Sequence, residues 1–383
     1  MQKDTTSLTA DEAAAYLGVS RATLYAYVSR GLVASEPGDD PARRARRYPR
    51  ASLDRLKAQR AERRDPASGA LRWGAPVLES ALTLIRDGRL FYRGRDACEL
   101  SRTATLEEVA ALLWTGDAAG AAELFPPAAE RPEDAGPFAD RLVARLVEER
   151  AASPLSLDGA GPAALRAAGR TVSGLFDALG ATGGGDLAER LARGWRSQHV
   201  DELRAALVLC ADHELNASAF TARCVASTDA PIGNALLAAL CALEGRRHGG
   251  ASRAAEDLLD DAERRGAEQA CRRAVARTGW LPAFGHPLYP DGDPRAREIL
   301  DRLHLPESDY VARVVAFGRE LGSFPSLDFA LAALSHCAAW PADAPFAVFA
   351  LGRSVGWVAH AFEAAETGAL IRPRARYVGV APR

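Results

Sequence analysis

The sequence lacks the features of a secreted, membrane-spanning or metal-stabilised protein. Its six cysteines are scattered and no two have a CxxC spacing, so neither a zinc site nor a disulfide framework is indicated. No apolar run reaches the roughly 18 residues of a membrane-spanning helix. The opening segment, MQKDTTSLTADEA, lacks the basic-then-apolar order of a secretory signal. We therefore expect a cytoplasmic protein with no membrane segment and no metal-ligand cluster.

The composition predicts a chain that folds around a sizeable core. It has 383 residues, of which 48% are hydrophobic, and this length favours two or three domains. The formal net charge of −2 is unevenly distributed, because residues 1–65 carry 13 Lys and Arg against 9 Asp and Glu. Ten of those basic residues lie within 41–64. This stretch is a candidate surface for a polyanion.

Two short helices are predicted near the start of the chain. Thr9 and Glu12 have the S/T-x-x-E spacing of a capping box, which predicts a helix that Gly18 ends. Ser20 can cap a second helix, RATLYAYVSRG. In this helix Leu24 and Val28 would face inward, and the side chains expected to point outward are those of Arg21, Thr23 and Tyr27.

This helix pair, with the Pro/Gly/Asp-rich connection and RRYPRASLDRL that follow it, resembles the winged helix-turn-helix of the MerR or excisionase type. In that family the second helix enters the major groove of DNA and the basic wing holds phosphate. The resemblance implies a domain over 1–65 that could contact DNA through Arg21, Thr23, Arg43, Arg44, Arg46 and Arg47. The same segment also fits a small helical bundle used for dimerisation or docking, with a solvated Arg run.

A linker is predicted at 66–70, within the charged and Pro/Ser/Gly-containing phrase RDPASGA. Beyond it the chain is rich in Ala and Leu at helical spacing, as in LEEVAALLW (106–114) and ADRLVARLVEER (139–150). We expect a mainly α-helical body.

Three of the seven histidines stand in distinctive phrases: ADHELNASAFTAR around His213, LEGRRHGGAS around His248, and FGHPLYPDGDPRAR around His286. Two glycines follow His248, so a substrate could approach the backbone closely, and a helix that begins after them would favour a neutral imidazole. Pro287 fixes the backbone after His286, and Arg295 follows within one short loop. The remaining four histidines have no such context: His199, His304, His336 and His360.

These phrases resemble, in order and spacing, those of the citrate synthase family. The similarity extends upstream to GRLFYRGRDACELSRTATLEEVAALLWTG and downstream to FPSLDFALAAL, FAVFALGRSVGWVAHAFE and IRPRARYVG. It covers roughly residues 70–383. It implies a large helical domain formed by 71–248 and 339–383, and a small helical domain over 249–338. The active site would lie in the cleft between them, and closure of the small domain would exclude water.

The resemblance also implies a reaction, in which acetyl-CoA or propionyl-CoA is joined to oxaloacetate and the thioester is hydrolysed, with no permanently bound cofactor. Removal of a proton from the acyl methyl needs a carboxylate base and a donor at the thioester oxygen, which Asp328 and His248 match. His286 matches the group that polarises the acceptor carbonyl and protonates its alkoxide. The residues that match the family's contacts to the oxo acid are His213, Arg295, Arg353 and Arg372. By the same resemblance Arg372 would come from the partner subunit of an obligatory homodimer.

Two departures from the family pattern bear on these roles. The residues around Asp328, SLDFA, are more apolar than in many relatives, which predicts a raised pKa and a stronger base. Pro290 stands where relatives often carry a Lys or Arg that could help to bind CoA phosphates. Arg246, Arg247 or Arg297 could bind the CoA phosphates instead. The sequence does not decide between them.

A DNA-binding regulator that senses a dicarboxylate or an acyl-CoA is the alternative function. A sensor would need the arginines but not Asp328, whose evident task is proton abstraction, so the enzyme is favoured. Acetyl and propionyl donors differ by one methylene, worth about 1–3 kcal/mol of discrimination, and the choice between them stays open.

Overall fold

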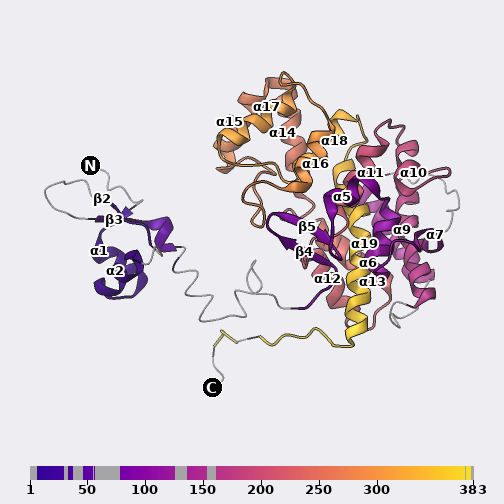
Figure 1. Ribbon diagram of the computed structural model, residues 1–383, viewed down its shortest axis with the longest axis horizontal. Helices are drawn as coiled ribbons and strands as arrows, with labels where there is room; N and C mark the ends of the chain where they lie inside the picture. Colours follow the sequence, from indigo (N-terminus) through magenta and orange to yellow (C-terminus); the bar gives the residue numbers. More distant parts are fainter. Residues whose placement is uncertain are drawn as a thin grey trace. The chain divides into compact units, whose positions relative to one another are not determined.

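The computed structural model describes residues 7–29, 33–37, 46–54, 56, 78–125, 136–152, 161–375 and 377–380. The chain forms two compact units, Met1–Glu79 and Ser80–Arg383 (Figure 1). Two predictions lie outside the described residues: the linker at 66–70, and the candidate DNA contacts Arg43 and Arg44. Within the described ranges, no helix combines the length and the apolar character needed to cross a bilayer.

The first unit has the elements of a winged helix-turn-helix: β1 (Ser7–Leu8), α1 (Ala10–Leu17), α2 (Arg21–Ser29), β2 (Glu36–Pro37), β3 (Arg46–Pro49) and a helical segment at 50–54. The predicted capping box is present, with the Thr9 and Glu12 side chains each accepting from the other's backbone N–H. Gly18 ends α1 in the left-handed region, at φ 61°. Strand β3 pairs antiparallel with both β1 and β2, and the β2–β3 pair is the wing.

A small core holds this unit together, and Leu24, Tyr48 and Leu53 are buried in it. The prediction for Tyr27 was wrong. Its ring is half-buried and packs against this core, because Tyr27 lies three residues after Leu24 on the same side of α2. Arg21 is exposed as expected.

The second unit opens with an antiparallel three-stranded sheet: β4 (Thr83–Arg86), β5 (Arg89–Tyr92) and β6 (Arg95–Asp96). Its described helices are α5 (Ala97–Thr103), α6 (Leu106–Thr115), α7 (Ala121–Leu124), α8 (Phe138–Ala152), α9 (Pro162–Ala178), α10 (Leu187–Gly194), α11 (Val200–Cys210), α12 (Ala217–Ala226), α13 (Ile232–Leu243), α14 (Ala251–Arg265), α15 (Ala267–Thr278), α16 (Pro294–Arg302), α17 (Tyr310–Glu320), α18 (Leu327–Cys337) and α19 (Ala344–Thr367). The predicted mainly helical body is confirmed.

Two hydrophobic cores form within this unit. The larger surrounds α19, which packs on α11, α12, α13 and α6. The smaller joins α14, α15, α17 and α18, which lie together in Figure 1. Helix α18 contributes to both cores, since Leu327 and Leu331 face the first and Phe329 faces the second.

Two glycines let α19 approach α11 closely. A Cβ at Gly352 would lie 2.5 Å from Leu207 O, and one at Gly356 would lie 2.2 Å from Ala211 O. Any larger residue at either position would push the two backbones apart. This close packing fixes the position of the turn after α11, which contains His213.

Candidate active site

His213 and His286 lie against each other, and Tyr289 joins them. The two imidazole rings meet edge to face with centroids 5.2 Å apart, and His213 Nε2 lies 3.0 Å from Tyr289 Oη. His213 comes from the turn between α11 and α12, and the other two residues come from the loop before α16. The Leu288 backbone N–H donates to His286 Nδ1 over 3.2 Å. A neutral His286 therefore carries its ring hydrogen on Nε2, where it can be donated.

His248 is held by the start of α12. Its Nε2 lies 2.9 Å from Ser218 Oγ and 3.2 Å from Asn216 Oδ1. The amide of Asn216 caps α12, since Oδ1 accepts from the backbone N–H groups of Ser218 and Ala219. The Ser218 hydroxyl accepts from Trp357 Nε1 over 3.0 Å, and its single proton can go to Asn216 or to His248. Donation to Asn216 leaves the ring hydrogen on Nε2, which then donates to Asn216 Oδ1. Donation to His248 places the hydrogen on Nδ1 and gives up the contact with Asn216 Oδ1, because an amide oxygen can only accept.

All three histidines are poised to be neutral near pH 7. Burial, with the positive charge of Arg353, lowers the pKa of His248 to about 4. Burial and then Arg295 lower the pKa of His286 to about 4, although Asp293 opposes this. The pKa of His213 is lowered well below its usual value, first by burial and then by the two arginines. Burial and Arg353 thus account for the neutral His248 expected from the sequence.

Arg295 is fixed by Asp293, the residue that caps α16. Its Nε and Nη2 donate to the two carboxylate oxygens over 3.0 and 2.7 Å, and its backbone N–H also reaches Asp293. Asp293 in turn accepts from the Leu327 backbone N–H at 3.3 Å, at the start of α18. Burial favours loss of the Arg295 proton, but the carboxylate outweighs it and raises the pKa of Arg295. The guanidinium therefore remains a cation within the protein.

Arg353 lies in the middle of α19 and is only 1% exposed. Its Nε donates to Cys210 O over 2.7 Å, and its guanidinium stacks over the Phe349 ring at 4.8 Å. Its Nη2 is buried and has no hydrogen-bond partner. A buried donor of this kind is costly unless a ligand satisfies it. Burial lowers the pKa of Arg353, against the attraction of Asp212.

Asp328 lies in the first turn of α18 and carries an unsatisfied oxygen. Its Oδ1 is buried with no hydrogen-bond partner, although the side chain as a whole keeps some exposure. Burial raises the pKa of Asp328 to about 6, while the positive charges of Arg295 and Arg353 oppose the rise. The raised pKa expected from the apolar SLDFA phrase is thus present. Such a carboxylate is a stronger base than an exposed aspartate.

Six of the seven predicted catalytic and substrate-binding residues are linked by these contacts or by mutual electrostatic influence: His213, His248, His286, Arg295, Asp328 and Arg353. Arg372 is exposed and lies beyond the end of α19. Its neighbour Ile371 donates from its backbone N–H to Ser227 Oγ, just after α12. The structure thus does not bring Arg372 to the other six within one chain.

Sequence reasoning missed several members of the site. Asn216 and Ser218 carried a signal, because the N-x-S phrase that begins three residues after His213 predicts a helix cap. Tyr289 had no such signal. Nor did Asp212 and His360, which are fully buried and face each other with His360 Nε2 3.2 Å from Asp212 Oδ1.

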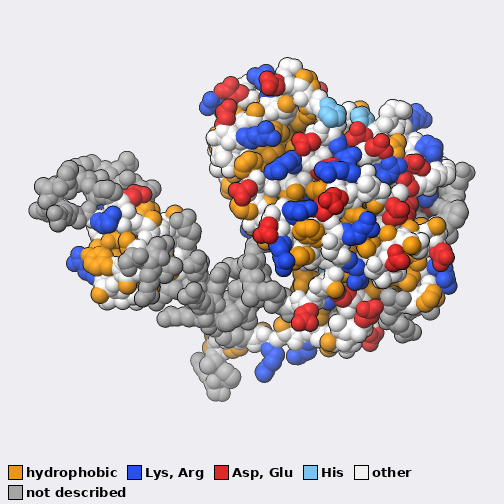
Figure 2. Space-filling model, viewed as in Figure 1, with side chains coloured by type: hydrophobic (Ala, Val, Ile, Leu, Met, Phe, Trp, Pro, Cys, Tyr) orange, Lys and Arg blue, Asp and Glu red, His pale blue; other side chains and the backbone are white. Residues whose placement is uncertain are grey.

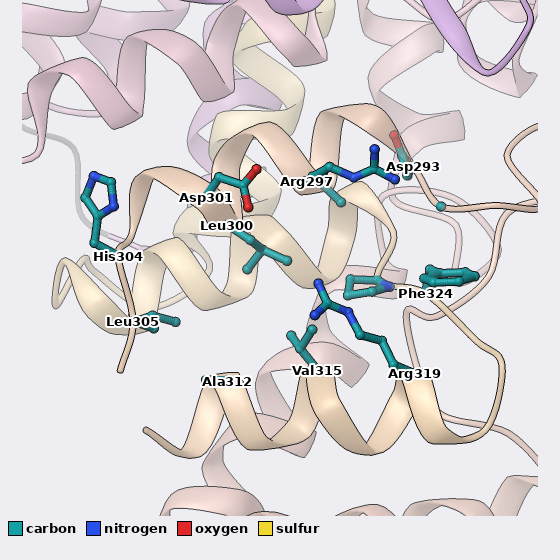
Figure 3. Close-up of a pocket in the computed structure, with 13 residues that line it drawn as sticks. Asp293, Arg297, Leu300, Asp301, His304, Leu305, Ala312, Val315, Arg319 and Phe324 are labelled. Carbon is teal, nitrogen blue, oxygen red and sulfur yellow. The ribbon is translucent and has the colours of Figure 1, made fainter. Parts of the chain in front are cut away.

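A pocket of about 500 Å³ lies between α16 and α17 (Figure 3). Its floor and sides include Leu300, Val315 and Phe324, and Arg297 and Arg319 project over it from the two helices. None of the three distinctive histidines lines it. Asp293 is shared with the site above, so the pocket borders the histidine cluster without being part of it.

Of the candidate DNA contacts that the structure describes, Arg21 and Arg46 are exposed, and Thr23 and Arg47 are half-buried. Arg21, at the start of α2, pairs with Asp11 of α1 at 3.2 Å. Thr23 is half-buried, and its hydroxyl lies 2.9 Å from Ser20 Oγ in the cap of α2. Arg46 is exposed on β3, and the neighbouring Arg47 is half-buried. In the space-filling view, hydrophobic and basic atoms are both visible on this unit (Figure 2).

No group of three or more His, Cys, Asp or Glu that could hold a metal ion occurs among the residues that the structure describes.

Two family models match the chain. One, described as "Citrate synthase, C-terminal domain", covers residues 70–149 and 162–374. The other, described as "Helix-turn-helix domain", covers residues 7–61. Together they account for both compact units.

Curated relatives carry related names. "Citrate synthase" of Haloferax volcanii is 31% identical over 360 residues, 80% of this chain and 94% of the relative. "Citrate synthase 2" of Bacillus subtilis is 36% identical and covers 47% of this chain. "2-Methylcitrate synthase" of Shewanella oneidensis is 33% identical and covers 48% of this chain. The chain spans about half the length of the last two, 51% and 52%, and 53% of "Putative citrate synthase 2" of Mycobacterium tuberculosis.

Solved structures show the same fold. Citrate synthase from Thermotoga maritima matches with a TM-score of 0.63 and 25% identity, over 81% of this chain and 95% of that one. A ternary complex of carboxymethyl coenzyme A and oxaloacetate with citrate synthase from Thermoplasma acidophilum matches with a TM-score of 0.68 and 24% identity, over the same shares.

Proposed function

This chain belongs to the citrate synthase family, and on that premise we propose that it joins an acyl-CoA to oxaloacetate and hydrolyses the thioester that results. The products would be CoA and citrate from acetyl-CoA, or 2-methylcitrate from propionyl-CoA. Both names occur among the relatives, and the one-methylene difference between the donors is left to experiment. No permanently bound cofactor is needed for this acyltransferase chemistry, and a protein that uses these metabolites is expected in the cytoplasm.

The first step is removal of a proton from the acyl methyl by Asp328. The pKa of about 6 makes its carboxylate a stronger base than usual while leaving it mostly ionised at pH 7. The enolate oxygen that forms needs a donor, and His248 supplies it from Nδ1 when Ser218 donates to Nε2. The alternative, donation by Ser218 to Asn216, puts the hydrogen on Nε2 and leaves no donor toward the thioester. Substrate binding would select the first arrangement.

The second step is attack of the enolate on the oxaloacetate carbonyl. His286 carries its hydrogen on Nε2 when neutral, because Nδ1 accepts from Leu288 N–H, and this hydrogen passes to the new alkoxide. Arg353 offers its unpartnered Nη2 to a substrate carboxylate. Arg295 has Nε and Nη2 occupied by Asp293, so Nη1 is its donor toward substrate. His213 is a further contact, next to His286.

The proposed assembly is a homodimer in which Arg372 of one subunit completes the site of its partner. Two observations support this: Arg372 is exposed beyond α19, and it lies apart from the other six residues in its own chain. We also propose that 249–338 is the small domain, which carries the second hydrophobic core, and that 71–248 with 339–383 is the large one. Closure between them would bring the α16 and α18 residues to the substrate.

One observation carries the enzymatic proposal: a carboxylate with a buried, unpartnered oxygen and a raised pKa lies beside two buried arginines and a set of neutral histidines. A sensor of dicarboxylates needs the cations and not this base. The test is oxaloacetate-dependent release of CoA thiol from acetyl-CoA and propionyl-CoA, with the native chain and Asp328→Ala compared. We expect release that the substitution abolishes. No release with either donor, from a folded chain that binds oxaloacetate, would favour the sensor.

A second function, DNA binding by residues 1–65, is favoured by the first unit. The helix-turn-helix match, the exposed Arg21 on α2 and the basic strand β3 of the wing support it. Phosphate contacts release counterions, so binding should weaken steeply as salt rises. The test is retention of the full chain on duplex DNA at low and high salt beside a version that lacks residues 1–65. Equal retention of both versions at low salt would contradict this proposal.

A further inference from the structure

Four hydrogen-bonded side chains form a row that ends at Asp212, the residue directly before His213. Arg223 Nη1 lies 2.5 Å from Glu363 Oε2 and 3.3 Å from His360 Nδ1. His360 Nε2 lies 3.2 Å from Asp212 Oδ1. Asp212, Arg223 and His360 are all at most 2% exposed. We call Asp212, His360, Arg223 and Glu363 the 212–363 relay.

Hydrogen-bond chemistry orders this relay. A guanidinium can only donate, so His360 Nδ1 accepts from Arg223. A neutral His360 then carries its hydrogen on Nε2 and donates it to Asp212. Burial alone would raise the pKa of Asp212, but His360, Arg353 and the Thr83 hydroxyl together lower it. Asp212 is therefore a buried carboxylate with fixed donors, beside the buried cation Arg353.

The relay is coupled to the site through the backbone at 212. Asp212 directly precedes His213, whose ring meets Tyr289 and His286. The same turn touches α19, since a Cβ at Gly356 would lie 2.8 Å from Asp212 Oδ1. Gly356 is one helical turn before His360, so the helix that carries His360 rests directly on the turn. The His360–Asp212 bond is therefore one of the contacts that hold the turn carrying His213 against α19.

The segment that opens the second unit closes the relay at both ends. The Ala81 backbone N–H donates to Glu363 Oε1 over 2.7 Å, and the Thr83 hydroxyl donates to Asp212 Oδ2 over 2.5 Å. Both acidic ends of the relay thus accept a donor from residues 81–83. These donors also tie β4 to α19 and to the turn after α11.

We infer that His360 is a positioning residue: through Asp212 it fixes His213 and the charge next to Arg353, and thereby the affinity of the site for the oxo dicarboxylate. This inference rests on the proposed function. A residue that only stabilised the fold would alter the melting temperature without distinguishing the two substrates. A residue that positions His213 should alter the KM for oxaloacetate and leave that for the acyl-CoA unchanged.

The experiment compares two substitutions of similar size in the full chain. His360→Gln keeps one acceptor for Arg223 and one donor for Asp212, whereas His360→Leu removes both. We expect His360→Leu to raise the KM for oxaloacetate by about tenfold or more and to change the KM for acyl-CoA by less than about twofold. His360→Gln should restore the native KM to within about threefold. Equal shifts in both KM values, or a folded His360→Leu chain with the native KM for oxaloacetate, would overturn the inference.

Thr83→Val covers the case in which His360→Leu does not fold. It removes one donor to Asp212 at the half-buried edge of the relay. We expect it to raise the KM for oxaloacetate by about threefold, and an unchanged value would count against the relay.

Histidine-selective nitrogen-15 NMR tests the relay without turnover. The ring signals of His213 should shift in Thr83→Val and His360→Leu and should stay close to native in His360→Gln. Unshifted His213 signals in the first two variants would overturn the relay. A native chain that releases no CoA would refute the proposed function, and the NMR comparison would still decide the relay.

Discussion

Replacement of Asp328 by Asn should abolish turnover and stabilise the fold. The side chain is isosteric, but the amide cannot act as a base, so we expect kcat to fall by about 10²–10⁴ or more. The folded state holds the Asp328 proton more tightly than the unfolded chain, since the pKa is about 6 against an ordinary 3.8. Ionisation of this group therefore destabilises the native chain as the pH rises from below 4 to above 6.

The magnitude follows from the two pKa values. At about 1.4 kcal/mol per pKa unit, the penalty approaches about 3 kcal/mol at pH 7 and is roughly half of that at pH 5. Because Asp328 keeps some exposure, we expect Asp328→Asn to gain about 1–3 kcal/mol at pH 7. The gain should shrink as the pH falls and approach zero only below about pH 3, where the carboxyl is protonated in both the folded and the unfolded state.

The assay is urea unfolding at pH 5, 6 and 7, followed by tryptophan fluorescence, because all six tryptophans lie beyond the helix-turn-helix residues and five of them lie in the Ser80–Arg383 unit. Asp301→Asn, which neutralises an exposed carboxylate on α16, is the matched control. An Asp328→Asn chain that is no more stable than the native chain at pH 7, or a gain that does not vary with pH, would refute the reasoning.

Three further predictions concern the base, the donor and the wing. The value of kcat/KM should fall tenfold per pH unit below pH 6, where Asp328 protonates. A pH profile that begins to fall only near pH 4 would show that the base has the pKa of an ordinary aspartate. Ser218→Ala should lower kcat by about tenfold or more and leave the KM for oxaloacetate unchanged, because it removes the donor that places the His248 hydrogen on Nδ1; a native kcat would exclude this role. Arg46→Ala with Arg47→Ala should lower the slope of log affinity against log salt by about one for each DNA phosphate that the wing no longer neutralises, as measured by DNA retention; an unchanged slope would remove the wing from the interface.

Local chemistry explains what could be predicted from the sequence. The capping box of Thr9 and Glu12 depends on groups three residues apart, so its pattern is visible in the letters alone. The raised pKa of Asp328 followed from its apolar neighbours in the chain. The prediction that Tyr27 points outward was wrong, because its position in α2 also borders the core of the first unit.

Interactions between distant segments explain what could not be predicted. His360 stood in no distinctive phrase, because its partners Asp212 and Arg223 lie 148 and 137 residues earlier in the chain. The burial and the Arg353 charge that lower the pKa of His248 could not be read from the residues next to it, because Arg353 lies far along the chain. Residues this far apart in the sequence bury one another only in the folded chain, where α19 packs against the turn after α11.

The measurement that tests the central claim most directly is identification of the product formed from carbon-13-labelled acetyl-CoA and oxaloacetate. The account predicts a tricarboxylic acid that carries the labelled acetyl carbons, formed in equal amount with free CoA and absent with Asp328→Asn. Labelled acetate in place of the tricarboxylic acid would show thioester hydrolysis without carbon–carbon bond formation and would contradict the account.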